Sequence, residues 1–336
     1  MKEIKLTMLA ALLFCFAAMN AQPSSITPTD YQKMLGRGLD ADWWGRSEKN
    51  KQGDYTELAV AKFARQGVQH IRIRMHHYNV TAQDLGRLKK QIAACRHNGL
   101  VPVIAFSAKP YKENPTSAEH EKVVKWWRKM AEALKDEASD VSFDLIIEPS
   151  HKLKKNPDEL NSLYDHCVTA IRETNPHRII FIAPQNLSHP EGLQNLVIPQ
   201  DGNGFIMAEW HFYAAGPDKS NPKKLWTTGT DTEKQLIRER IEIARQWQEI
   251  TGIRTWVGAW MPGNYNKGNH YTVEEQVIFA DFMCRELEKA GIPFAINADK
   301  IFYDYATDQW KEAYIPLMDK IFGKDTSCPK KQHIPL

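Results

Sequence analysis

Short apolar runs alternate with longer amphipathic segments along most of the chain. Eight of the apolar runs have strand length, at residues 37–42, 70–75, 101–106, 143–148, 178–183, 205–213, 255–261 and 294–299. Segments with helical periodicity lie at 55–66, 82–98, 118–137, 157–174, 190–197, 232–251, 272–290 and 309–322. This alternation is typical of parallel strands that are joined by helical crossovers.

The pattern also favours a closed barrel over an open sheet. Runs 101–106 and 178–182 are apolar on both faces, as expected when helices cover a strand outside and packed side chains cover it inside. Gly99, Gly252 and Gly291 stand just after helix ends, where a left-handed residue is favoured. Eight strand–helix repeats close a barrel, and no G-x-G-x-x-G turn follows the first strand. We therefore predict an α/β fold that is a single (β/α)8 TIM barrel.

The two ends of the chain depart from this pattern. An apolar run at 6–18 follows two lysines and precedes small or polar residues up to Ala21, which is the composition of a secretory signal peptide. We predict a signal peptide at 1–21, the barrel at 22–323, a loose tail at 324–336, and a secreted or periplasmic protein. No stretch reaches the roughly 20 apolar residues of a membrane span, so none is expected.

Composition narrows the classes of partner. A formal net charge of +3 is too small to indicate a nucleic-acid-binding surface. The cysteines are widely spaced without a C-x-x-C pair, which predicts neither a disulfide framework nor a zinc site. We expect no cofactor and no metal, although His76, His77 and Asp40 are residue types that could contribute metal ligands.

Glu148 is the strongest single candidate for chemistry. Catalytic groups of a (β/α)8 barrel come from the C-terminal ends of the strands, and Glu148 ends the fourth apolar run. A carboxyl group in that position is partly desolvated, which raises its pKa and suits a general acid. The alternative is a structural residue at the rim that forms a salt bridge with Arg72 or Arg74.

Three polar residues alternate along the sixth strand. Glu209, His211 and Tyr213 share one face because side chains in a strand alternate with a period of two. Burying three polar groups in a row without partners is costly, so this face indicates a site at the barrel mouth. Glu209 lies about 6.6 Å deeper along the strand than His211 and alternatively anchors an arginine.

These strand ends resemble glycoside hydrolase family 5, the cellulase-like TIM barrels, over essentially the whole mature length. Residues 66–73 are similar to the family's G-[FV]-x-x-[IV]-R-[IL], which implies that Arg72 supports the catalytic carboxylates. Residues 143–149 look like F-E-L-x-N-E-P and imply that Glu148 is the general acid/base. The stretch from His211 to Tyr213 resembles H-x-Y, whose side chains line the sugar subsite and orient the nucleophile.

The chain departs from the family pattern at positions that matter for the mechanism. Residues 256–260 align with [VI]-x-[VI]-G-E-[FWY], but Ala259 occupies the place of the nucleophile. Retaining hydrolysis needs two carboxylates about 5 Å apart, and alanine cannot form the glycosyl-enzyme. Ile147 replaces the asparagine that binds the 2-hydroxyl, and the eighth strand ends with Asn297, Ala298 and Asp299 instead of the family's usual tryptophan.

Three functions remain open at this stage. The first is a glycoside hydrolase whose second catalytic group is Glu209, Asp299 or the substrate itself. The second is a lyase for uronate-containing polysaccharide, in which Tyr213 or His211 exchanges the C5 proton. Its basic rim would consist of Arg72, Arg74, His76, His77, Lys109, His151 and Lys152. The third is a barrel that binds carbohydrate without cleaving it.

All three hypotheses require a polysaccharide or oligosaccharide partner and a sugar-sized hollow on which Glu148, His211 and Tyr213 converge. We place the hydrolase first. The residues expected to bind substrate lie at or beside strand ends, and they are Asp40, Trp43, Trp44, Arg74, His76, His77, Lys109, His151, Trp226, Trp260, Tyr265, Asn297 and Asp299. The tryptophans and Tyr265 are included because aromatic faces stack on sugar rings.

Overall fold

The computed structural model describes residues 25–47, 50–213, 226, 228–263 and 271–323. The predicted signal peptide at 1–21 and tail at 324–336 lie outside the described residues. No described helix is long and apolar enough to cross a membrane.

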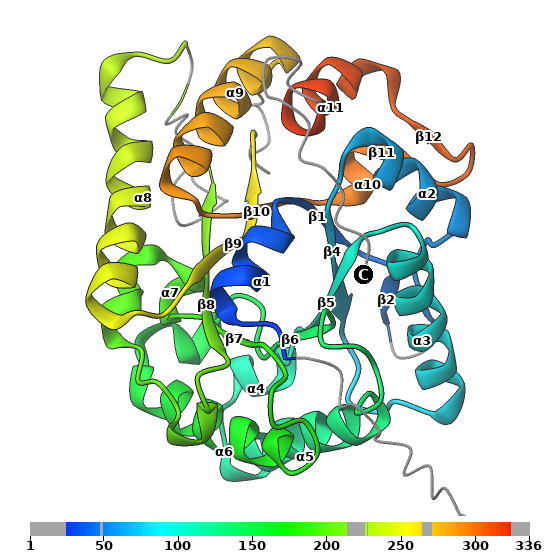
Figure 1. Cartoon of the computed structure of the whole chain (residues 1–336), viewed down its shortest axis with the longest axis vertical. Coiled ribbons are helices and arrows are strands. Elements are labelled where there is room, and N and C mark those ends of the chain that lie inside the picture. The colour runs from blue at the N-terminus through cyan, green and yellow to red at the C-terminus, as the bar shows by residue number, and fades with distance from the viewer. Residues whose placement is uncertain (1–24, 48–49, 214–225, 227, 264–270, 324–336) are drawn as a thin grey trace, which may run out of the picture.

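Eight described strands close into a parallel barrel, which confirms the predicted fold (Figure 1). Around the barrel the order is β1, β10, β9, β8, β7, β6, β5 and β4, and each neighbouring pair is parallel. The bounds are β1 (Arg37–Ala41), β4 (His70–Met75), β5 (Val101–Phe106), β6 (Ser142–Asp144), β7 (Ile180–Ile182), β8 (Ile206–Tyr213), β9 (Thr255–Met261) and β10 (Phe294–Asn297).

Long helices surround the strands, as Figure 1 shows. They are α2 (Glu57–Gln66), α3 (Ala82–His97), α5 (Ser117–Ala133), α6 (Pro157–Arg172), α8 (Asp231–Thr251), α9 (Val273–Ala290) and α11 (Ile315–Phe322). Thr81, Thr230 and Thr272 close capping boxes at three helix starts, and Gly252 and Gly291 take the left-handed conformation after two helix ends. Local capping chemistry therefore fixes the crossovers between strands.

Two of the predicted helices are wrong in part. The segment 190–197 contains the 3-10 helix η2 (Pro190–Asn195) after the short α7 (Gln185–Ser188), and η3 (Gln200–Gly202) follows. Pro190 and Gly192 within six residues leave too few good helix formers for an α-helix. The segment 309–322 starts as a strand, β12 (Gln309–Trp310), that pairs with β11 (Tyr303–Asp304) and continues as η4 (Glu312–Tyr314) before α11.

Apolar packing closes the N-terminal end of the barrel. The helix α1 (Pro28–Leu35), which the sequence pattern did not reveal, lies in front of the strands in Figure 1. Its Tyr31 and Leu35 are fully buried in one cluster with Phe181 and Trp256 from the strands. This end is therefore filled, and the polar strand ends gather at the other end.

Small additional elements follow the C-terminal ends of the strands and build the rim there. They are the hairpin β2 (Trp44–Ser47) and β3 (Asn50–Gln52), the helix α4 (Lys109–Glu113), the 3-10 helix η1 (His151–Lys155) and the helix α10 (Asp299–Phe302). None of them was expected from the sequence, because each is too short for a periodic pattern.

Candidate active site

A cavity of about 320 Å³ opens at the C-terminal ends of the strands. Its described lining is Asp40, Arg46, Arg74, His76, Ser107, Lys109, Lys112, Ile147, Glu148, His151, His211, Ala259 and Asn297. These residues come from strand ends and from the rim elements that follow them. This is the end at which (β/α)8 barrels carry their active sites.

Glu148 and His211 meet at this cavity. The Oε1 atom of Glu148 lies 3.2 Å from Nδ1 of His211, and the Glu148 side chain keeps 16% of its surface exposed. The predicted convergence is confirmed for these two residues. Tyr213 ends β8, but its side chain lies outside what the structure describes.

The backbone that carries Glu148 is held from both sides. The Ile147 N–H donates to the Phe106 carbonyl, and the buried Lys112 ammonium donates to the Ile147 carbonyl at 2.7 Å. Glu148 itself has a φ of +48°, a conformation that costs a non-glycine residue free energy and needs such support. These contacts direct its carboxylate into the cavity.

A group of buried ionisable side chains, here named the Arg72 layer, lies at the base of the cavity and includes His211. It comprises Arg72, Asp144, Glu209 and His211, and the first three side chains are fully buried. The Nη2 atom of Arg72 lies 2.5 Å from Asp144 Oδ2 and 2.6 Å from Glu209 Oε1. Glu209 also pairs with Nε2 of His211. Gly258 makes room for this contact, because a Cβ there would meet Glu209 Oε1 at 2.1 Å.

Burial and neighbouring charges shift the pKa values of three residues in the Arg72 layer. Burial raises the pKa of Asp144 and outweighs the opposing effect of Arg72. Burial alone would raise the pKa of Glu209, but Arg72 and His211 together lower it. Burial alone would lower the pKa of His211, but Glu209 and Glu148 together raise it. The neighbouring carboxyl groups thus favour the protonated form of His211.

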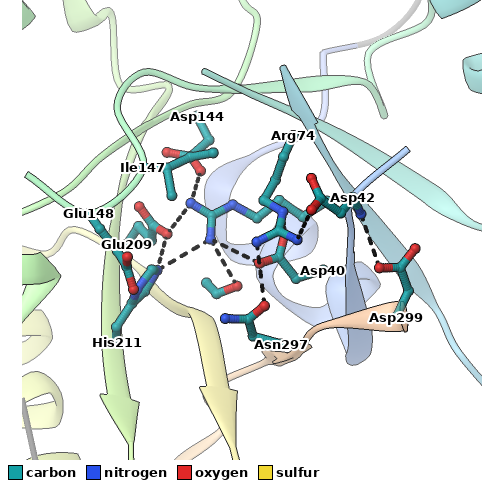
Figure 2. Close-up of polar contacts among 12 residues, drawn as sticks. Asp40, Asp42, Arg74, Asp144, Ile147, Glu148, Glu209, His211, Asn297 and Asp299 are labelled. Carbon is teal, nitrogen blue, oxygen red and sulfur yellow. Dashed lines mark hydrogen bonds and ion pairs between the residues drawn. The ribbon is translucent and has the colours of Figure 1, made fainter. Parts of the chain in front are cut away.

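A second set, here named the Arg74 layer, borders the cavity. It comprises Arg74, Asp40, Asp42 and Asn297 (Figure 2). The Nε atom of Arg74 lies 3.3 Å from Asp40 Oδ1, and its Nη1 donates to Asn297 Oδ1 at 3.4 Å. Burial raises the pKa of Asp40 and outweighs the lowering by Arg74. His76 adds a contact of 3.0 Å to Asp42.

Neither Glu209 nor Asp299 lines the cavity. Both residues are fully buried. Asp299 accepts hydrogen bonds from the Asp42 backbone at 3.1 Å and from the Tyr305 hydroxyl at 2.6 Å. The two carboxyl groups that were predicted as alternative second catalytic groups therefore lie outside the cavity lining, where Glu209 Oε1 contacts Arg72 and His211 and both oxygens of Asp299 accept hydrogen bonds.

The predicted stacking tryptophans lie in the hydrophobic core. Trp43, Trp44, Trp226 and Trp260 are each at most 2% exposed and are absent from the described lining. Trp226 packs against Phe279 and Phe282 of α9, and Trp260 packs against Phe279 and Phe294. Their rings are covered by protein, so they offer no stacking face in this arrangement. Tyr265 lies outside the described residues.

Some of the polar residues that were predicted to bind substrate line the cavity, and others do not. Asp40, Arg74, His76, Lys109, His151 and Asn297 line the cavity, whereas His77 bonds to the Gly45 carbonyl at 2.6 Å and does not. Sequence reasoning missed Arg46, Ser107 and Lys112. The signal for Lys112 was Pro110, because proline in a first turn indicates a helix that starts at the end of a strand. In the described part of the chain, no group of three or more His, Cys, Asp or Glu side chains could hold a metal ion.

Residues 28–296 match the family model described as Cellulase (glycosyl hydrolase family 5). Endoglucanase H of Acetivibrio thermocellus is 20% identical over 254 residues, which cover 71% of this chain and 27% of that protein. Endoglucanase C of the same organism is 24% identical over 176 residues, which cover 47% of this chain and 50% of that protein. The chain thus spans half or less of the length of these curated relatives.

Solved structures resemble the chain over most of its length. The endoglucanase Cel5A from the hyperthermophilic Thermotoga maritima has a TM-score of 0.77 at 18% identity, with 88% of this chain and 100% of that chain covered. The Clostridial cellulose synthase subunit Z from Clostridioides difficile has a TM-score of 0.72 at 18% identity, with 85% and 99% covered. At such identities the likeness shows the fold.

Proposed function

Because the chain belongs to glycoside hydrolase family 5, we propose that it hydrolyses a glycosidic bond of a polysaccharide or oligosaccharide in the cavity at the barrel mouth. Glu148 is the group that transfers the proton. The observation that carries this proposal is the contact of 3.2 Å between Glu148 and the buried His211 at the cavity wall. Glu209 and Glu148 also raise the pKa of His211, which favours a proton on the imidazole at the cavity wall.

The second catalytic group distinguishes this site from a retaining one. Ala259 lines the cavity in register with His211, and its methyl group cannot form a covalent glycosyl-enzyme. Among the described lining residues, Asp40 is the remaining carboxyl group besides Glu148. We assign to Asp40 the activation of a water molecule. Direct attack by that water inverts the configuration at the anomeric carbon.

The test is an analysis of products by mass, and of the anomeric configuration by NMR, after incubation with neutral and uronate-containing polysaccharides. The Glu148→Gln variant is expected to lose roughly 10²–10⁴-fold in turnover because it cannot transfer a proton. Glu121→Gln, on the exposed surface of α5, is the matched control and retains full activity. Activity of the Glu148→Gln protein above about a tenth of the wild type contradicts the role of Glu148.

Each product class decides between the mechanisms. A product that has gained water with an inverted anomeric centre supports the proposal, whereas retention contradicts the assignment of Asp40 and favours attack by the substrate itself. An unsaturated product without added water, which absorbs near-ultraviolet light, contradicts hydrolysis and favours the lyase that uses His211 or Tyr213. Absence of cleavage on the whole panel favours a carbohydrate-binding protein.

We also propose that the protein is secreted or periplasmic after removal of residues 1–21. The composition of the leader supports this proposal. Expression of the full chain in a bacterial host, followed by mass measurement of the exported protein, is expected to find Gln22 at the N-terminus. Retention of the intact leader on a cytoplasmic protein contradicts it.

A further inference from the structure

Four basic side chains line the cavity against two carboxyl groups. The cations are Arg46, Arg74, Lys109 and Lys112, and the carboxyl groups are Asp40 and Glu148. Arg74 is already compensated by Asp40 at 3.3 Å and by Asp42 at 3.6 Å. The excess positive charge therefore rests on the cations that belong to β2 and α4.

Two of those cations stand at the rim with weak protein partners. Arg46 contacts Asp42 at 3.4 Å, and Lys109 contacts Glu113 at 3.7 Å. Both cationic side chains are about 70% exposed, at 70% for Arg46 and 68% for Lys109. Exposed ion pairs of this kind contribute little free energy, so an anionic ligand can replace the protein carboxylate at small cost.

The third cation stands deeper, next to the proton-transferring group. Lys112 is 7% exposed, and its ammonium donates to the carbonyl of Ile147, the residue before Glu148. Ile147 itself stands where the family pattern has an amide, and Ala259 stands where it has a carboxylate. The cavity thus lacks one negative charge of that pattern and has an ammonium group beside Glu148.

The described lining also lacks the surfaces that suit a neutral sugar. No phenylalanine, tyrosine or tryptophan is among the described lining residues, and the tryptophans near the strand ends are buried in the core. Neutral pyranose rings are held largely through aromatic faces, whereas anionic groups are held by charge-assisted hydrogen bonds from Lys and Arg. The composition of this wall fits the second kind of ligand.

We propose that the cavity takes a glycan with anionic groups, either uronate carboxylates or sulfate esters, and that Arg46, Lys109 and Lys112 bind those groups. The inference rests on the proposed function, because it names the substrate class of the same site. Lys109, Lys112 and Glu148 line the same cavity, so a glycan whose anionic groups are bound by the two lysines enters the cavity that holds Glu148.

The test measures binding by calorimetry at low salt with the otherwise intact Glu148→Gln chain, so that turnover does not interfere. The probes are a hexauronate, a sulfated galactan hexasaccharide and cellohexaose. At least one acidic probe is expected to bind about tenfold more tightly than cellohexaose, and its affinity is expected to fall as salt is added. If neither acidic probe exceeds cellohexaose, the inference is overturned. Comparison of the hexauronate with the sulfated hexasaccharide shows whether the cavity prefers carboxylates or sulfate esters.

Charge-neutral variants locate the binding. Arg46→Gln combined with Lys109→Gln is expected to weaken the favoured acidic probe about fivefold and to leave cellohexaose unchanged. Lys289→Gln, at an exposed position on α9, removes a charge away from the cavity and is the matched control. Equal losses in the two proteins, or no loss in either, contradict the assignment to the cavity rim.

Failure of this inference and failure of the proposed function give different results. Hydrolysis of a neutral glucan without preferential acidic binding preserves the proposed function and removes the inference. Tight binding of an acidic probe that wild-type protein does not hydrolyse preserves the inference and removes the proposed function.

Discussion

Arg72 and Arg74 stand two residues apart on the same face of β4, yet they belong to different environments. Arg72 is fully enclosed by carboxylates and the Gly258 carbonyl, whereas Arg74 lies one level higher and borders the cavity. Figure 2 shows Glu209 and His211 on one side of the close-up and Asp40, Asp42 and Asp299 on the other. Arginine thus has two roles here: Arg72 contacts buried carboxyl groups below the cavity, and Arg74 lines the cavity itself.

This difference indicates that the distance of a charged side chain from the cavity determines whether it supports the structure or contacts the substrate. In the Arg72 layer, Arg72 lies between the buried carboxyl groups of Asp144 and Glu209, and Glu209 also pairs with His211, so the layer holds His211 in position. In the Arg74 layer, Arg74 and Asp40 also face the cavity, where substrate and water enter. We therefore expect changes in the first layer to act mainly on stability and changes in the second to act mainly on activity.

The largest expected effect tests this contrast directly. Arg72→Met leaves Asp144 and Glu209 buried without their cation, and is expected to lower the free energy of unfolding by about 3–5 kcal/mol. Arg74→Met, the matched change one level higher, is expected to cost about 1–2 kcal/mol, because Asp42 keeps His76 as a partner and the pKa of Asp40 is already raised towards the neutral acid by burial. Both values come from denaturant titration. Equal losses would remove the distinction between the two layers.

The next effect concerns Asp299, which lies beside the Arg74 layer. Burial raises its pKa from 3.8 to about 6, against the hydrogen bond from Tyr305. Between these values the folded chain holds a proton that the unfolded chain releases, so stability falls as pH rises from about 4 to about 6. Asp299→Asn is expected to remove about 1–3 kcal/mol of this decline, measured as the unfolding free energy at several pH values. If the variant and the wild type lose unfolding free energy equally between about pH 4 and about pH 6, the role of Asp299 is contradicted.

A third change separates position from charge in the Arg72 layer. Glu209→Gln keeps a hydrogen-bond acceptor but removes a charge that raises the pKa of His211. A raised histidine pKa preserves the imidazolium up to higher pH, so the variant is expected to lose activity at lower pH than the wild type on the alkaline side. Asp144→Asn is the control, because its raised pKa already favours the neutral acid. Coincident profiles for Glu209→Gln and wild type contradict this role.

Much of the fold could be predicted from the sequence because the barrel repeats one strong pattern. The strands at 70–75, 101–106 and 255–261 were predicted with the bounds that the structure has. The predictions failed for elements that are too short to show a hydrophobic repeat. The six-residue η2 was predicted as part of a longer helix, and the eight-residue α1 was not predicted at all. The strand predicted at 143–148 spans residues 142–144, and Glu148 beyond its end takes a positive φ.

The candidate site could be predicted where residues lie at strand ends or shortly after them. Glu148 and His211 were found because strand ends converge by geometry, and Asp40, Arg74 and Asn297 follow the same rule. The tryptophans failed as substrate contacts because hydrophobicity alone does not tell a buried ring from a stacking platform. Lys112 was missed because Pro110 indicates only the start of its short helix, and a linear pattern does not reveal the contact of the ammonium group with a backbone carbonyl.

The smallest expected effect returns to the position where the two layers meet the cavity. Ala259 is 1% exposed and lies in register with His211, so Ala259→Glu places a carboxylate at the wall and adds one negative charge to it. The variant is expected to bind the favoured acidic probe about fivefold more weakly, whereas the nearly isosteric Ala259→Gln is not expected to do so beyond its steric cost. Calorimetry on both variants separates charge from size.

The same variant also sharpens the question of the mechanism. If wild type hydrolyses its substrate by inversion, the new carboxylate competes with water for the anomeric carbon and is expected to introduce some retained product. If the wild type is inert on every polysaccharide while Ala259→Glu hydrolyses a β-glucan, the missing nucleophile alone accounts for the inactivity. In that case the cavity is a binding site and Asp40 has no catalytic role, since one carboxylate at position 259 would then be sufficient to complete the pair with Glu148.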